Sequence, residues 1–189
     1  MQKDIGSVMG LYPTPVTVVG TVIDGRVNFL TIAHVGVVEH HAFVISIDKT
    51  HELSDRGIRQ NKTVSVSLVS PDMMEAADWC GIAKGAKTDK SGAFEHHFID
   101  EVPNAPLIDR APVSMACEIV DQFEVGNFTN YVCSPLHTFV QQDCLTEKGK
   151  IDYEAASPVL FEFQSAQYLS TGAVIGTCWN AGRDFVPQA

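Results

Sequence analysis

An Asp-Gly pair between two runs of β-branched residues constrains the fold of this chain most strongly. Asp24-Gly25 is flanked by residues 16–23 and 27–38, both rich in Val and Ile. Asp-Gly readily adopts the positive φ angles of a type I′ turn, whose twist matches that of two antiparallel strands. The sequence therefore predicts a hairpin of two long strands, residues 16–23 and residues 27–38.

Further runs predict more strands of the same kind. Residues 63–69 alternate between apolar and polar, and residues 42–47 form a short β-branched run. Gly126-Asn127 separates residues 113–125 from residues 128–140 as a second hairpin, and residues 159–163 and 168–169 predict short closing strands. Helices are expected at residues 50–61 and about 71–80, with a helical turn at 153–156. We expect a mainly β, antiparallel barrel with helical insertions, because closing a sheet removes its exposed edges.

Length and charge limit the possible functions. With 189 residues and no repeat or linker, residues 1–189 are expected to form a single domain. The net charge of −10 repels nucleic-acid phosphates and anionic lipid, so neither nucleic acid nor membrane is an expected partner. Residues 1–9 carry no apolar signal segment, and an odd number of Cys, five, fits reduced thiols. We expect a cytoplasmic protein.

One loop concentrates positive charge in this acidic chain. Residues 81–92 contain three Gly together with Lys84, Lys87 and Lys90. The spacing is not that of a phosphate-binding P-loop, and no G-x-G-x-x-G follows a strand. Because Gly permits close backbone approach and Lys supplies charge, the loop is a candidate for holding a ligand phosphate, the alternative being a solvated surface loop.

Metal binding and nucleophilic catalysis are not favoured. Neighbouring residues on a strand point to opposite faces, so neither His40-His41 nor His96-His97 chelates a metal as a pair, and no Cys or His has structural-zinc spacing. No G-x-S-x-G motif is present. Cys80 as a buried thiol is preferred to Cys80 as a thiolate beside a His.

Several segments, taken in order, resemble a known family. They are residues 12–16 (YPTPV), 28–36 (NFLTIAHVG), 48–53 (DKTHEL), 78–81 (DWCG) followed by Gly85 and Asp89-Lys90, and 105–108 (APLI). From about residue 12 to about residue 176 the chain resembles the flavin reductase family with the FMN-binding split-barrel fold, and in particular its flavoredoxin-like branch.

The resemblance implies a homodimer with FMN at the subunit interface and the chemistry residing on the flavin, so no catalytic side chain is expected. The flavin ring is expected along the segment from Asn28 to His34, held largely by backbone groups, and His34 is a possible modulator of the flavin potential. The resemblance also implies phosphate or ribityl contacts in two later segments. The expected cofactor-binding residues are Asn28, Phe29, Leu30, Thr31, Ile32, Ala33, His34, Lys49, Thr50, His51, Cys80, Gly81, Lys84, Gly85, Asp89 and Lys90.

Three functions follow as hypotheses. The first is an FMN-dependent oxidoreductase of the flavin reductase type, passing electrons from NAD(P)H or a redox protein to a flavin or protein acceptor. The second is a flavoredoxin-like electron carrier without direct NAD(P)H oxidation, since an acidic surface suits a basic redox partner. The third is a non-catalytic split-barrel module that binds flavin or haem.

Overall fold

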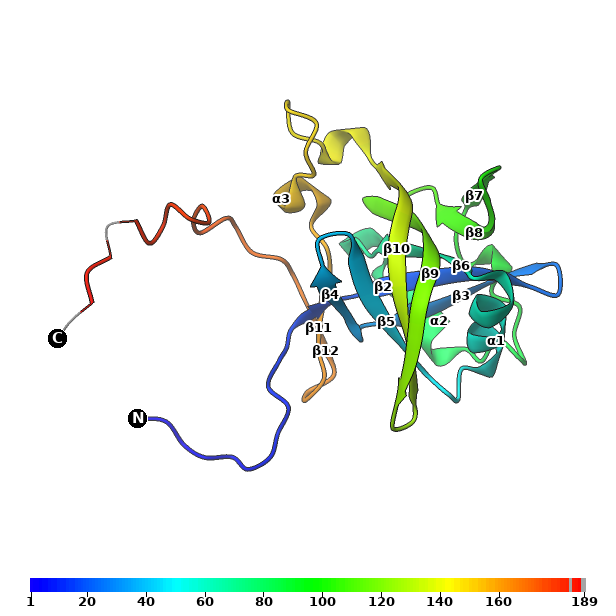
Figure 1. The fold of residues 1–189 in the computed structure, drawn as a ribbon, viewed down its shortest axis with the longest axis horizontal. Coiled ribbons are helices and arrows are strands. Elements are labelled where there is room, and N and C mark those ends of the chain that lie inside the picture. Colours follow the sequence, from blue (N-terminus) through cyan, green and yellow to red (C-terminus); the bar gives the residue numbers. More distant parts are fainter. Residues whose placement is uncertain (184, 188–189) are drawn as a thin grey trace.

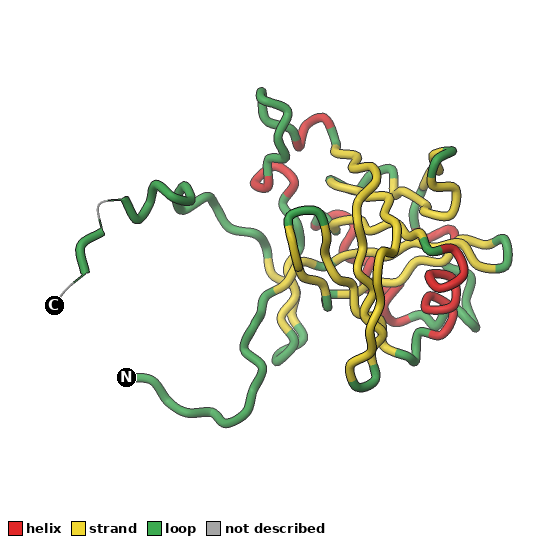
Figure 2. Tube along the Cα trace, in the orientation of Figure 1, coloured by secondary structure: helices red, strands yellow, loops and turns green. Residues whose placement is uncertain are grey.

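The structure is a computed structural model that describes residues 1–183 and 185–187 (Figure 1). Strands make up most of its body and helices lie at the periphery (Figure 2). The strands are β1 (Thr14–Pro15), β2 (Thr17–Ile23), β3 (Arg26–Ile32), β4 (Val35–Glu39), β5 (Ala42–Asp48), β6 (Thr63–Leu68), β7 (His96–Ile99), β8 (Val102–Ile108), β9 (Val113–Val125), β10 (Phe128–Val140), β11 (Leu160–Glu162) and β12 (Gln167–Leu169). The helices are α1 (Glu52–Asn61), α2 (Met74–Ile82) and α3 (Tyr153–Ala156), with 3₁₀ turns η1 (Pro71–Met73), η2 (Ser91–Ala93) and η3 (Gln142–Cys144).

Seven antiparallel strands form the main sheet in the order β3-β2-β6-β9-β10-β5-β4. The predicted hairpin at Asp24-Gly25 is confirmed for β2 and β3, and the two turn residues have φ angles of 51° and 74°. Two positive φ angles are what a type I′ turn requires. The mainly β antiparallel split-barrel fold expected from the sequence is thus the fold that the chain adopts.

The prediction of one strand over residues 27–38 is wrong. The chain leaves the sheet after Ile32 and re-enters it at Val35, and β3 and β4 lie at opposite edges of the main sheet. At the crossing, the backbone carbonyl of His34 accepts a hydrogen bond from the amide of Ser46 on β5 at 2.9 Å. The break at Ala33-His34 therefore carries the chain from one edge to the other and brings the two edges together as a barrel.

The second predicted hairpin is confirmed with the bounds expected, because β9 and β10 are joined at Gly126, whose φ is 56°. Its register shifts twice, between Val132 and Cys133 and between Pro135 and His137. Pro has no N–H to give to the ladder, so an irregularity at Pro135 follows from its chemistry.

Two helices close the barrel against two separate apolar clusters. Helix α1 follows β5, as expected, and buries Ile58 among barrel residues that include Leu30 and Tyr131. Helix α2 extends two residues beyond the expected end at Cys80 and buries Ala77 and Cys80 against Phe29. Residues 28–32 therefore face one cluster or the other alternately, as a strand must.

A further hairpin, β7–β8, was not predicted from the sequence. Pro103 and Pro106 lie within β8, and Pro is tolerated in a strand where its missing N–H faces away from the ladder. A third, small sheet has the order β1-β11-β12, so the start of the chain pairs with its later part.

Both ends of the described chain extend away from the barrel on the same side (Figure 1). Within the described residues, no helix combines the length and the apolar character needed to cross a membrane.

Candidate functional site

A hollow of about 160 Å³ lies between β3, α2 and the small sheet. Thr31, Ile32 and Ala33 form the strand side of this ring-side hollow, and Gly81 and Ile82 form the helix side. The Thr31 hydroxyl donates to the carbonyl of Ala77 at 2.5 Å, which fixes the end of β3 to α2. Strand β3 is an edge strand of the main sheet, so one side of its backbone points away from the other strands of that sheet. A flat, apolar strip bordered by backbone polar groups suits a planar heteroaromatic ring.

A second hollow of about 260 Å³ begins where the first ends. It is lined by the first turn of α1, by Thr50 and His51, by the loop Ala83 to Ala86, and by Lys90. Gly81 and Ile82 line both hollows, so the two adjoin at these residues and together make up the candidate groove. The first turn of α1 presents backbone N–H groups and the positive end of the helix dipole, which favour an anion.

Lysines add positive charge to the second hollow, which we call the phosphate-side hollow because it has features that favour an anion. Lys84 is exposed at its rim, whereas Lys90 is 3% exposed. The Lys90 ammonium donates to the carbonyls of Cys80 at 3.0 Å and Ala83 at 3.1 Å, so it satisfies the last turn of α2. Burial lowers the pKa of Lys90. Lys90 therefore holds the wall of the hollow and places a positive charge beneath it.

Gly85 and Asn28 connect the lysine loop to α1. The Asn28 amide donates to the Ser54 hydroxyl at 2.8 Å, and both side chains are buried. A Cβ at Gly85 would collide with Asn28 Oδ1 and come within 3.0 Å of Leu53 Cδ2. The absence of a side chain at residue 85 is thus what lets the loop lie against the start of α1.

His51 stands at the N-terminal boundary of α1 and lines the phosphate-side hollow. Burial lowers its pKa from the usual 6.5; Asp48 opposes that shift, and Lys90 and Lys84 add to it. The imidazole is therefore neutral at pH 7 and becomes easier to protonate when an anion is placed beside it.

The structure brings together nine of the expected residues: Thr31, Ile32, Ala33, Thr50, His51, Gly81, Lys84, Gly85 and Lys90 line the groove. Others lie elsewhere. The side chains of Phe29, Leu30 and Cys80 are in the core and do not line the groove, and burial raises the pKa of the Cys80 thiol to about 11.

Lys49, His34 and Asp89 also fall outside the groove lining. The Lys49 ammonium is bound to Glu124 at 2.7 Å. His34 is exposed beyond the ring-side end, with its ring 5.2 Å from that of Phe128. Asp89 accepts a hydrogen bond from the amide of Ser91 and faces a different hollow.

The sequence reasoning missed the wall of the ring-side hollow that the small sheet supplies. Phe161 and Tyr168 line it, and the Tyr168 hydroxyl donates to Asp78 at 2.6 Å. Burial and this carboxylate raise the pKa of Tyr168 to about 12. Asp78 lies in a segment that carries the family resemblance, but the 90 residues between the partners leave no sequence signal for the pair.

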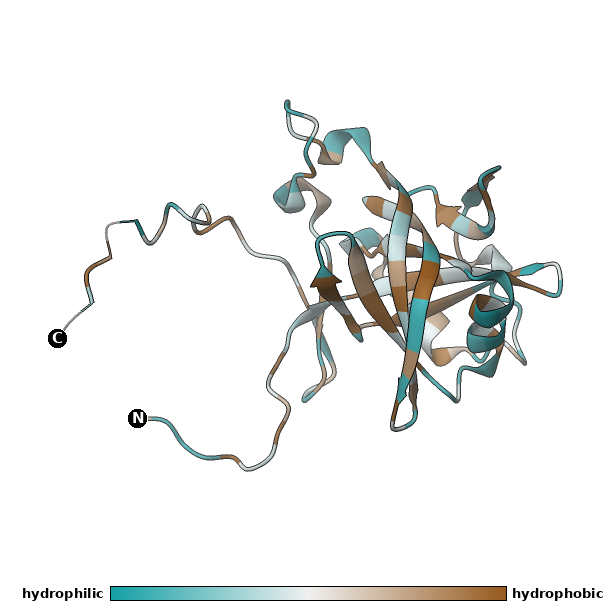
Figure 3. Ribbon diagram, in the orientation of Figure 1, coloured by the Kyte–Doolittle hydropathy of each residue, from teal (hydrophilic) through white to brown (hydrophobic). Residues whose placement is uncertain are grey.

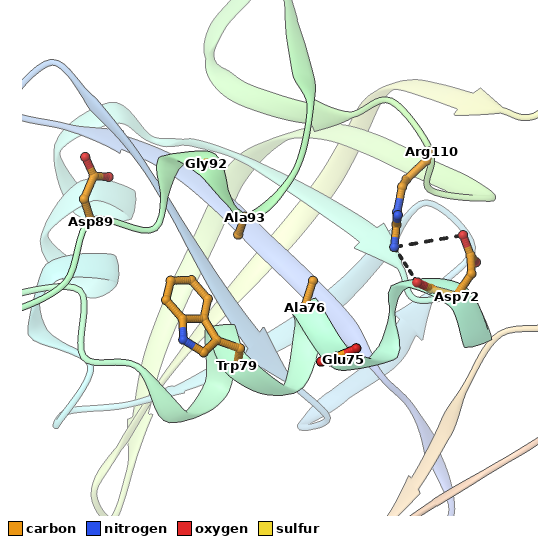
Figure 4. A pocket seen from close by; sticks show the side chains of 8 residues that line it. All are labelled: Asp72, Glu75, Ala76, Trp79, Asp89, Gly92, Ala93 and Arg110. Atoms are coloured by element: carbon orange, nitrogen blue, oxygen red, sulfur yellow. Dashed lines mark hydrogen bonds and ion pairs between the residues drawn. The ribbon is translucent and has the colours of Figure 1, made fainter.

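A larger hollow, about 550 Å³, lies between α2 and η2 (Figure 4). Arg110 lines this hollow, and its guanidinium group donates to the backbone carbonyl of Asp72 at 2.5 Å. The other charged side chains that line the hollow are the carboxylates of Asp72, Glu75 and Asp89. Those carboxylates repel a phosphate, so the smaller groove is the better candidate for an anionic cofactor. Among residues 1–183 and 185–187, no cluster of three His, Cys, Asp or Glu side chains is placed to hold a metal ion.

Known proteins share the fold that carries this groove. The family model described as "Flavin reductase like domain" matches residues 9–168. The structure of flavoredoxin from Methanosarcina acetivorans superimposes with a TM-score of 0.90 at 25% identity, covering 97% of this chain and 98% of that one. Flavoredoxin of Desulfovibrio vulgaris (Miyazaki F) gives 0.89 at 26% identity, covering 97% and 100%.

A third structure shares the fold. The FMN-binding protein from Thermus thermophilus gives a TM-score of 0.75 at 19% identity, covering 92% of this chain and 97% of that one. Comparison with curated proteins gave no significant match.

Proposed function

Because the chain belongs to the flavin reductase-like domain family, we propose that it is an FMN-dependent oxidoreductase whose flavin occupies the candidate groove between β3, α2 and the first turn of α1. The family makes the chain a flavin-related oxidoreductase. The observation that supports FMN in particular is the polarity of the groove. An apolar strip at Thr31 and Ala33 runs into a hollow with a helix N-terminus and two lysines.

The residues present fit the parts of FMN. Gly81 leaves open the space opposite Thr31, since a Cβ there would stand 3.7 Å from the Thr31 Cβ. The first turn of α1, Thr50 and Lys84 are placed to hold the phosphate, with Lys90 supplying charge from below. When bound, FMN accepts two electrons from a donor and passes them to an acceptor. The chain orients the cofactor and keeps water from its buried face.

The test of the cofactor is a titration of flavin-free protein with FMN and with riboflavin, followed by flavin fluorescence. We expect FMN to bind at least tenfold more tightly, because only FMN carries the phosphate. Lys84→Ala is expected to weaken FMN binding several-fold and leave riboflavin unchanged. Lys87→Ala, in the same loop but outside the groove lining, is the matched control. Equal affinities for the two flavins would contradict the phosphate assignment.

We propose NAD(P)H as the electron donor, with a redox protein as the second candidate. The second candidate is favoured by the likeness to two flavoredoxins at 25% and 26% identity and by the net charge of −10, which suits a basic protein partner. Anaerobic addition of NADH or NADPH to the FMN-loaded protein separates the two. Rapid bleaching supports the reductase, and bleaching by dithionite alone supports the carrier.

We propose further that the working unit is a homodimer with FMN between subunits. One large apolar side chain of the groove is open to solvent: Ile82, which lines both hollows, is 72% exposed. An apolar side chain exposed at a ligand site favours a protein partner that covers it. Sedimentation of the flavin-loaded protein is expected to give twice the mass of the chain, and a monomer at all concentrations would contradict this proposal.

A further inference from the structure

The two ends of the described chain are extended arms that carry apolar side chains away from the barrel. We define the N-terminal arm as residues 1–11 and the C-terminal arm as residues 172–183 with 185–187. Figure 3 shows apolar residues at intervals along both arms. The exposed fractions are 83% for Leu11, 72% for Val174 and 94% for Trp179, and Ile175 is fully exposed.

The C-terminal arm is fixed at its root. The Thr171 hydroxyl donates to the carbonyl of Pro158 at 2.5 Å, and the amide of Val174 donates to the Glu154 carboxylate at 3.1 Å. Beyond that point the C-terminal arm makes local turn bonds between residues 177 and 183. The direction of the C-terminal arm is therefore set by the barrel, while its apolar side chains do not pack on that barrel.

Exposed apolar side chains of this size need a surface. Burying one Val, Ile or Leu stabilises a structure by about 1.5–3 kcal/mol relative to leaving it in water. Both arms run from the barrel on one side (Figure 1), so a surface that covered them would lie on that side.

The same side of the barrel carries an uncovered apolar face of its own. Strand β4 forms the edge of the main sheet there, and its Val37 and Val38 are 85% and 54% exposed. In a twofold dimer each copy offers the same elements, so an arm of one copy meets the β4 face of the other, and the reverse. The β4 face of one copy could thus be covered by the arm of the other copy.

We propose that the C-terminal arm of one copy packs through Val174, Ile175 and Trp179 on the β4 face of a second copy. The root of the arm follows β12, whose Tyr168 forms a wall of the ring-side hollow. The exchanged arms therefore border the flavin groove on its open side and exclude water from it. The arm exchange stands on the exposed side chains, and its effect on flavin rests on the proposed function.

Trp179 reports the exchange directly. The chain has two Trp, so Trp79→Phe leaves Trp179 as the sole indole. In flavin-free protein we expect its emission to shift to shorter wavelength on concentration, in step with the dimer fraction measured by sedimentation. Blue emission in the monomer would place the arm on its own barrel, and red emission in the dimer would place it outside the interface. Either result, or a chain that never dimerises, overturns the proposal.

A matched pair of charge variants tests the contact. Ile175→Glu introduces a carboxylate at a fully exposed apolar position, and Thr177→Glu introduces the same charge at an exposed polar position two residues on. We expect the dissociation constant of the dimer to rise at least tenfold for Ile175→Glu and less than threefold for Thr177→Glu. Equal changes would show that charge alone acts, and would contradict the packing.

The same samples separate this inference from the proposed function. If the emission of Trp179 follows dimerisation and FMN does not bind, the arm exchange stands and the cofactor proposal fails. If FMN binds and the emission of Trp179 does not change with concentration, the cofactor proposal stands and the arm exchange fails.

Discussion

At residue 85 a single missing side chain determines whether the lysine loop can lie against α1. Gly85→Ala would push a methyl group onto Asn28 and Leu53 and disturb the hydrogen bond from Asn28 to Ser54. We expect a loss of about 1–3 kcal/mol in the free energy of unfolding and weaker FMN binding. Urea denaturation and the flavin titration measure the two effects. Gly92→Ala, where a Cβ meets nothing within 4 Å, should change neither.

His51 makes stability depend on pH. The pKa of His51 is lowered in the folded protein, so the unfolded chain binds a proton more readily than the folded chain does. The free energy of unfolding therefore decreases as the pH is lowered below about 6.5. His51→Gln should flatten this dependence when urea denaturation is repeated at about pH 7.5 and about pH 5.5. Bound FMN should also reduce it, since a phosphate beside the imidazole raises the pKa. The same slope in the variant and the native protein would exclude His51 as the source.

On the scale of elements, one partly buried hydrogen-bond network attaches α1 to the barrel. The Tyr131 hydroxyl donates to Asp55 at 2.6 Å, and Arg59 binds the other oxygen of that carboxylate at 2.8 Å. Burial is the main cause that raises the pKa of Tyr131, and the hydrogen bond to Asp55 raises it further. The network fixes the direction of α1 and therefore where its N-terminus points.

Tyr131→Phe is expected to lower the free energy of unfolding by about 2 kcal/mol, because a hydrogen bond to a charged group is lost inside the protein. FMN affinity should fall more than riboflavin affinity, since in the proposed complex α1 lies beside the phosphate of FMN. Chemical denaturation and the paired titrations check both. Tyr153→Phe removes a hydroxyl from a Tyr that is 55% exposed and should leave stability within about 0.5 kcal/mol.

Local signals predicted the elements that local chemistry determines. Both hairpins form at their Gly-containing turns, and α1 and α2 lie where Pro71 and the apolar spacing place them. The break at Ala33-His34 was not predictable from periodicity, because the residues on either side remain apolar and β-branched. Strands β3 and β4 are separate because they lie at opposite edges of the main sheet, and that arrangement is a property of the closed barrel. The β7–β8 hairpin was missed because Pro103 and Pro106 argue against a strand unless its edge is free.

The candidate site divides in the same way. Thr31, Ala33, Gly81 and Gly85 were expected from the family resemblance, and they line the groove. Tyr168 was not, because its contact with Asp78 exists only once the small sheet has formed. Lys49 lies outside the groove lining because its ammonium is bound by Glu124 on β9, a residue distant from it in the sequence.

At the scale of the whole molecule, the net charge of −10 should govern encounters with electron acceptors. Reduction of a basic protein such as cytochrome c by the flavin-loaded protein, first reduced with dithionite, is expected to slow several-fold as salt rises from low to physiological concentration, because screening weakens steering. Reduction of an uncharged quinone should change little under the same conditions. Stopped-flow measurement of both rates checks this, and equal salt dependence would exclude electrostatic steering.

The order of strands in the main sheet also bears on when the groove for flavin forms. Thr17 on β2 is paired with Leu68 on β6, and Thr63 on β6 with Glu118 on β9, so neighbouring strands close long loops. Pairings of this kind form slowly. The groove draws its walls from Val16 through Tyr168 and does not exist until the small sheet is in place. Affinity for flavin would therefore require the paired small sheet, and a bound flavin would stabilise only molecules in which that sheet has formed.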